Sequence, residues 1–124
     1  MVNKTNKLSE SEILARLAAQ GMDSKKGENI VVLDLRELAS APTSFFVICN
    51  GNVPSHVSAI SDGVFEVIKK ATGQSPNKIE GYENAEWILM DYFDVVVHIF
   101  QKEKREFYRL EELWADARQL TLNK

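Results

Sequence analysis

The sequence of 124 residues has one cysteine, no long apolar run and no surplus of basic residues. Because Cys49 is alone, no internal disulfide can form, which is typical of a protein in a reducing compartment. No segment approaches the roughly 20 apolar residues that a membrane helix needs. The polar residues 1–7 lack the apolar core of a signal peptide and are expected to be flexible. We therefore predict a cytoplasmic protein that does not bind a membrane.

The charge of the chain is acidic and unevenly distributed. A formal net charge of −3 argues against binding nucleic acid through its phosphates, which requires a basic surface. Residues 77–100 contain five carboxylates and one lysine, which gives this segment a net charge of −4. A partner attracted by charge is therefore expected to be basic and to approach this segment.

Residues that carry catalytic or metal chemistry are also scarce. The chain has two histidines, His56 and His98, and contains no Cys-x-x-Cys, His-x-x-x-His or Asp-x-Asp pattern. Cys49 lies in an apolar run, which favours a buried, unreactive thiol, and His98 is interpreted as a polar residue satisfied on a sheet face. Gly51 follows a predicted strand, but neither a P-loop nor a G-x-G-x-x-G accompanies it. We predict no catalytic residue, no metal and no cofactor.

Hydrophobic periodicity and capping signals predict the secondary structure. Ser9 and Glu12 form a capping-box pattern, and Gly21 is a natural helix end. Gly63 inside the second predicted helix suggests that another element packs closely there. The predicted elements are helices at 9–21, 54–73 and 110–120 and strands at 30–35, 45–49, 78–80, 86–91 and 94–100.

These elements predict an α/β (α+β) fold. One domain, residues 8–118, is expected to hold a mixed sheet of about five strands with helices packed on it, followed by a tail at 119–124. The last two strands form a hairpin joined by Tyr92 and Phe93. Trp87 and Leu89 share one face of their strand because side chains alternate. Whether Trp87 and Tyr92 belong to the core or to an interface stays open on chemistry alone.

The chain resembles the Iojap-like family, the ribosomal silencing factors, over about residues 8–118. The later motifs that carry the resemblance are Glu80-Gly81, Trp87-Ile88-Leu89-Met90-Asp91-Tyr92, Asp94-Val95-Val96-Val97-His98-Ile99-Phe100, Arg105, Phe107-Tyr108, Leu110-Glu111 and Leu113-Trp114. The earlier ones are Val32-Leu33-Asp34-Leu35-Arg36, Phe46-Val47-Ile48 with Gly51, His56-Val57 and Ala59-Ile60.

This resemblance implies a function that involves binding and no catalysis. It implies a fold like a nucleotidyltransferase core without the catalytic carboxylates. It also implies a translational repressor that binds the large ribosomal subunit through its fourteenth protein, blocks joining of the small subunit when nutrients are scarce, and often forms a homodimer. The positions carried over as candidates for partner contact are Glu80, Trp87, Asp91, Tyr92, Asp94, His98 and Tyr108.

The sequence departs from the family pattern at four positions. Phe93 stands where the hairpin usually has glycine, so the turn is expected to be of another type or longer. Ser44 and Arg109 stand where aspartate is common, and Val53 replaces a serine that would cap the second helix, for which Asn52 is a possible substitute. Two alternative functions stay open: a homodimeric adaptor for another basic protein, and a residual nucleotidyltransferase.

Overall fold

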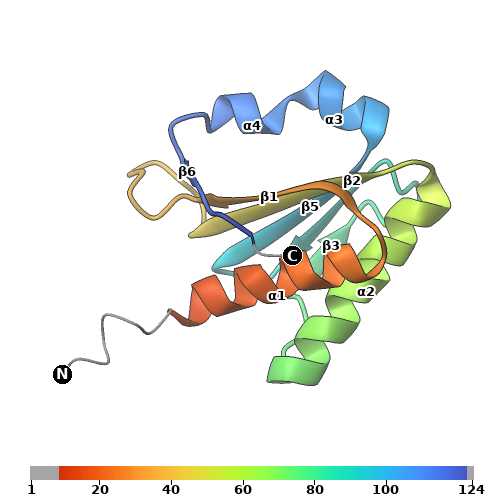
Figure 1. Cartoon of the computed structure of the whole chain (residues 1–124), viewed down its shortest axis with the longest axis horizontal. Helices are drawn as coiled ribbons and strands as arrows, with labels where there is room; N and C mark the ends of the chain where they lie inside the picture. The colour runs from red at the N-terminus through yellow and green to blue at the C-terminus, as the bar shows by residue number, and fades with distance from the viewer. Residues whose placement is uncertain (1–8, 123–124) are drawn as a thin grey trace.

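The computed structural model describes residues 9–122, so the predicted flexible residues 1–7 lie outside the part described. A central sheet has α1 and α2 on one side and α3 and α4 on the other (Figure 1). In chain order the elements are α1 (Glu10–Ser24), β1 (Glu28–Asp34), β2 (Phe45–Gly51), α2 (Pro54–Thr72), β3 (Lys78–Glu80), β4 (Trp87–Asp91), β5 (Val95–Gln101), α3 (Lys102–Tyr108), α4 (Leu110–Leu113) and β6 (Arg118–Gln119).

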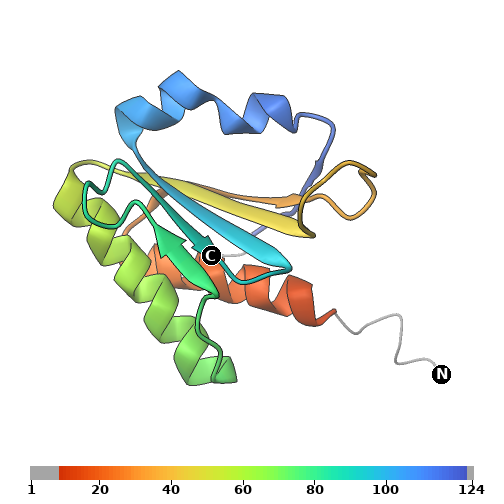
Figure 2. The same ribbon diagram turned by 180° about the vertical axis from the view of Figure 1, so that it is seen from behind.

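The sheet has six strands in the order β3-β4-β5-β2-β1-β6 (Figure 2). Only the pair β2–β5 is parallel, and the other pairs are antiparallel. This confirms the predicted α+β class and mixed sheet, to which β6 adds a further strand. All seven residues of β2 are buried, as a central strand covered on both faces requires.

The two long helices approach each other at glycines. The predicted cap of α1 is confirmed, because Ser9 Oγ accepts a hydrogen bond from Glu12 N at 3.1 Å. The predicted end at Gly21 is wrong, since α1 continues to Ser24. A Cβ on Gly21 would lie 2.6 Å from the Cα of Val64, and one on Gly63 would lie 2.9 Å from the oxygen of Gly21. Gly21 therefore serves helix contact, and the close packing predicted at Gly63 is confirmed.

The start and end of α2 follow from local signals. Pro54 occupies the first turn, and Gly73 ends the helix with a φ of 79°. The N-cap residue is Val53, and no side chain caps it. The substitution of Asn52 for the missing cap is therefore wrong; its backbone N–H instead donates to His56 Nδ1 at 3.1 Å.

The predicted helix at 110–120 is wrong. Only the short α4 forms there, and Leu113 is 75% exposed. The chain then extends as β6 along β1, where Leu120 N donates to Val32 O at 2.9 Å and Arg118 pairs with Asp34 at 2.6 Å. Leu120 packs with the core beneath α1 and α2, so part of the predicted tail belongs to the folded domain. Backbone pairing with β1 has overridden the helical spacing.

The turn of the β4–β5 hairpin is longer than two residues. Tyr92, Phe93 and Asp94 form the loop, because β5 begins only at Val95. Tyr92 N donates to Val95 O at 2.9 Å. Phe93 has a φ of 73°, in the left-handed region that glycine adopts without strain. Phe93 thus has a glycine-like backbone conformation at the position where the resemblance implied glycine.

Candidate protein-binding face

The face of the sheet on the α3–α4 side is only partly covered, and we refer to it as the outer face. Register in β3, β4 and β5 places Leu89 opposite both Glu80 and His98, and paired residues in antiparallel strands point to the same side. Trp87 pairs with Phe100 and shares this side with Leu89. Glu80 is exposed, while Trp87 and Leu89 are half-buried. The outer face is therefore open to solvent along β3 and β4.

An aromatic cluster forms the centre of the outer face. Trp87 stacks on Phe100 with ring centroids 4.8 Å apart, and Tyr108 of α3 contacts the same indole at 4.8 Å. The Nε1–H of Trp87 donates to His98 Nδ1 at 3.1 Å. The ring of Phe46 meets His98 edge-on at 4.6 Å. These contacts fix the orientation of the Trp87 indole at the border between buried and exposed surface.

His98 lies on the buried side of this cluster. It is 4% exposed, and burial lowers the pKa of its imidazole to about 4. Because Nδ1 accepts the hydrogen bond from Trp87, the ring proton lies on Nε2. That Nε2 has no hydrogen-bond partner among residues 9–122. The structure thus places His98 under the surface, as a positioning residue for Trp87.

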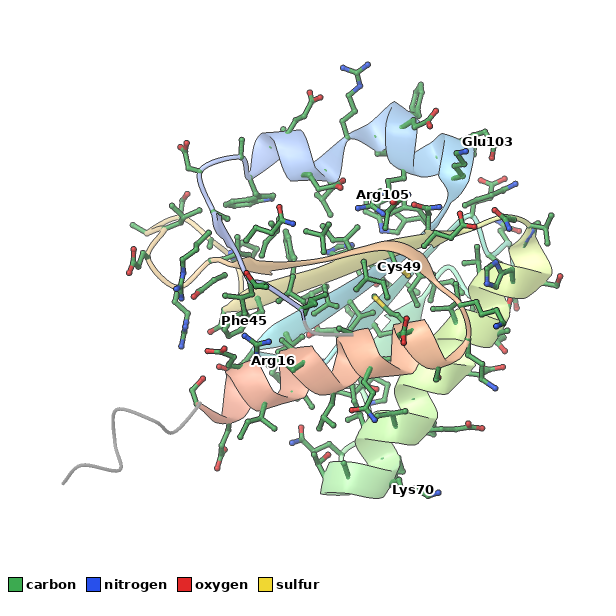
Figure 3. All side chains as sticks on the ribbon, viewed as in Figure 1. Arg16, Phe45, Cys49, Lys70, Glu103 and Arg105 are labelled. Atoms are coloured by element: carbon green, nitrogen blue, oxygen red, sulfur yellow. The ribbon has the colours of Figure 1, made fainter. Side chains whose placement is uncertain are left out.

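Residues 102–114, which we call the C-terminal arm, cross the outer face as α3 and α4. Arg105 lies between α3 and the sheet (Figure 3). It fastens the arm to the sheet, because its Nη1 donates to Asn29 O at 2.8 Å and to Asn50 Oδ1 at 2.9 Å, and its Nη2 pairs with Glu111 at 2.6 Å. These interactions place Tyr108 against Trp87. Sequence reasoning gave Arg105 no role, because Asn29 and Asn50 lie 76 and 55 residues away.

The acidic candidates differ in position. Glu80 lies on β3 and pairs with Lys78 at 3.2 Å, with both side chains exposed. Asp91 is half-buried at the end of β4, where its Oδ1 accepts the N–H of Phe93 at 2.8 Å. Asp94 is exposed in the hairpin loop, and its carbonyl oxygen accepts from the N–H of Ser44 at 3.1 Å. Asp91 therefore stabilises the turn, whereas the side chains of Glu80 and Asp94 are exposed to solvent.

Tyr92 lies on the other side of the sheet from Trp87. Its side chain is 3% exposed and packs in the core beneath α1 and α2. Burial raises the pKa of its hydroxyl to about 12, and this hydroxyl has no hydrogen-bond partner within the described chain. The prediction that Tyr92 contacts a partner at the surface is therefore wrong, because Tyr92 is a core residue. The candidates that reach the surface on or beside the outer face are Glu80, Trp87, Asp91, Asp94 and Tyr108.

The remaining reactive residues are engaged in the fold. Cys49 is fully buried, as predicted, and burial raises the pKa of its thiol to about 12, so the nucleophilic thiolate is suppressed. His56 accepts from Asn52 N through Nδ1 and lies 2.9 Å from Lys25 O through Nε2. Residues 9–122 contain no group of three His, Cys, Asp or Glu side chains that would hold a metal ion. In the same range, no helix combines the length and hydropathy needed to cross a bilayer.

Fold and face together define a single-domain α+β protein with an aromatic sheet face that is partly open to solvent. A family model described as "Ribosomal silencing factor during starvation" matches residues 8–124. Ribosomal silencing factors from Halalkalibacterium halodurans and Bacillus subtilis are 42% and 38% identical over 89% and 84% of this chain, and over 92% and 86% of their own. A crystal structure of a protein from Bacillus halodurans has a TM-score of 0.76 and 38% identity, covering 90% of this chain and 99% of its own. The chain belongs to the family of ribosomal silencing factors.

Proposed function

We propose that this protein represses translation by binding the large ribosomal subunit through its fourteenth protein and blocking the small subunit from joining. Family membership supports a silencing role on the ribosome, because the family model and the two relatives carry that description. The observation that carries the finer assignment is the outer face, open along β3 and β4 and centred on Trp87. Repression under nutrient limitation is part of the same proposal.

The chemistry of the outer face fits a basic protein. The segment 77–100 carries a net charge of −4, and two of its carboxylates, Glu80 and Asp91, lie on the side of Trp87, where negative charge would attract a basic partner. Trp87 and Tyr108 offer partly exposed rings, and such aromatic anchors contribute on the order of 2 kcal/mol or more to binding when they are fully desolvated. Blocking of subunit joining needs affinity and placement, and it needs no general base or metal.

Sedimentation with purified ribosomal subunits tests the proposal. The protein is first mixed with the large subunit, and the small subunit is then added. We expect co-migration with the large subunit and fewer joined ribosomes. If the protein stays at the top of the gradient and joining is unchanged, the proposal is wrong, and an adaptor for another basic protein becomes the better description.

A charge-reversal pair tests the location of the contact. Glu80→Lys changes the charge of the outer face, while Glu66→Lys makes the same change on the exposed side of α2. We expect Glu80→Lys to weaken binding to the large subunit about tenfold at low salt, with a smaller effect at high salt because exposed charges are screened. Glu66→Lys should leave affinity within twofold of the original protein. Equal effects of the two substitutions would contradict the assignment of the outer face.

Self-association belongs to the same proposal. The resemblance to the family implies a homodimer, and the chain has a mass of 14.0 kDa. Analytical ultracentrifugation of the free protein should therefore give twice this mass at micromolar concentration. A species of 14.0 kDa at every concentration would refute the dimer and leave the ribosome assignment unchanged.

A further inference from the structure

Phe93, at the tip of the β4–β5 hairpin, combines two unfavourable features. Its φ of 73° lies in the left-handed region, which residues with a Cβ rarely adopt and which is unusual for a bulky side chain. Its ring is also 69% exposed to solvent, and it lies outside both clusters of the hydrophobic core. Neither feature stabilises the folded domain. An aromatic residue held in this way suggests a role in binding.

The backbone of Phe93 is held on both sides. Its N–H donates to Asp91 Oδ1 at 2.8 Å, and its carbonyl oxygen accepts from Thr43 Oγ1 at 2.8 Å. The next carbonyl, that of Asp94, accepts from the N–H groups of Ser44 and Phe45, each at 3.1 Å. The loop is therefore tied to the start of β2. The direction in which the ring leaves the backbone is fixed before any partner arrives, which lowers the entropic cost of binding.

The surroundings of the tip indicate the chemistry of its partner. A hollow of about 280 Å³ beside Phe93 is lined by Leu38, Ala41 and Pro42 together with polar residues of the same loop. Asp94 also lines this hollow and is exposed. The lining contains one cation, Arg36, whose guanidinium pairs with Asp34 at 2.8 Å and with Glu12 at 3.5 Å. An exposed aromatic ring beside a carboxylate that has no ion pair among residues 9–122 complements an apolar recess bordered by lysine or arginine.

We propose that Phe93 is an anchor that inserts into an apolar, basic-rimmed recess on the protein to which the outer face binds. This inference rests on the proposed function, because it takes the ribosomal partner as the protein that holds the recess. It adds a second contact point at the hairpin tip, displaced along β4 and β5 from Trp87.

The substitution Phe93→Gly separates stability from binding. Glycine adopts the left-handed conformation without strain, so the melting temperature should stay equal or rise. Removal of the ring should raise the Kd for the large subunit at least tenfold, measured by titrating labelled protein with purified subunits. Phe93→Asn is the second variant, because asparagine also tolerates positive φ but lacks the ring. Both variants should behave alike.

Phe65→Ala is the control. Phe65 is a partly exposed phenylalanine, at 36%, in α2 on the opposite side of the sheet, and its loss should change the Kd less than twofold. If the original protein binds and Glu80→Lys weakens binding while both Phe93 variants bind normally, the anchor is refuted and the proposed function stands. If Phe93→Gly melts at a lower temperature, the strain argument is refuted. If the original protein does not bind the large subunit, the proposed function and the anchor both fail.

Discussion

Acidification from pH 7 to pH 5 should destabilise this protein through His98. The ring is 4% exposed, and burial lowers the pKa of its imidazole from about 6.5 in an unfolded chain to about 4 in the folded one. The unfolded chain therefore binds a proton more readily than the folded protein. The contribution of His98 to the free energy of unfolding is fully present above pH 6.5 and declines as the pH falls from 6.5 toward 4.

The two pKa values of His98 give the magnitude. At pH 5 the unfolded histidine is almost fully protonated while the folded one is mostly neutral. With about 1.4 kcal/mol for each pH unit below 6.5, the loss between pH 7 and pH 5 is about 2 kcal/mol. Asp34 does not contribute in this window, because a carboxylate with a lowered pKa loses its stabilising effect only below about pH 4.

Urea unfolding at pH 7, 6 and 5 measures this effect in the original protein and in His98→Gln. Glutamine has no charge change in this range, and its amide oxygen can accept the Nε1–H of Trp87 in place of His98 Nδ1. The difference in unfolding free energy between the two proteins should shift by about 2 kcal/mol from pH 7 to pH 5. Parallel pH profiles, or a His98 ring that titrates near 6.5 by NMR, would refute the buried, neutral imidazole.

Two further predictions concern the fold that carries the outer face. Gly21→Ala should lower the unfolding free energy by about 2 kcal/mol in urea, because the new Cβ would lie 2.6 Å from the Cα of Val64 and force the helices apart; an unchanged midpoint would contradict this. Asp34→Asn should cost about 2 kcal/mol at pH 7, where the hydrogen bonds from Arg36 and Arg118 hold the pKa of Asp34 well below its usual range. This loss should shrink as the pH falls below about 4, and a loss that stays constant to pH 2 would refute the ion-pair account.

Local signals predicted most of the elements. Pro54 and Gly73 marked the bounds of α2, and the capping pattern at Ser9 marked the start of α1. Alternation along β4 placed Trp87 and Leu89 on one side of the strand, which is where the structure has them. Each of these signals depends on neighbours within a few residues, so it can be read without knowledge of the fold.

Local signals gave wrong predictions where contacts with distant residues decide the structure. The spacing of Leu113 and Leu120 is helical, yet Leu120 packs beneath α1 while Leu113 is exposed, because β1 offers backbone partners to the extended chain. Gly21 is a residue type that often ends helices, but here it lies inside α1 and allows the close approach of α2. The role of Arg105 in fastening the C-terminal arm depends on groups contributed by β1 and β2.

The sequence by itself determined the acidic charge of residues 77–100, the approximate positions of β1 to β5 and the sets of residues that share a side of each of these strands. The tertiary structure decided which side stays open. The period of two separates Trp87 from Tyr92, but only the placement of α1 and α2 buries Tyr92 and leaves Trp87 at the surface. The tertiary structure also decided the conformation of Phe93, because hydrogen bonds to Asp91 and Thr43 hold its backbone at positive φ and so fix the direction of its ring. Alternation is a local property of the backbone, whereas burial depends on which distant elements cover each face.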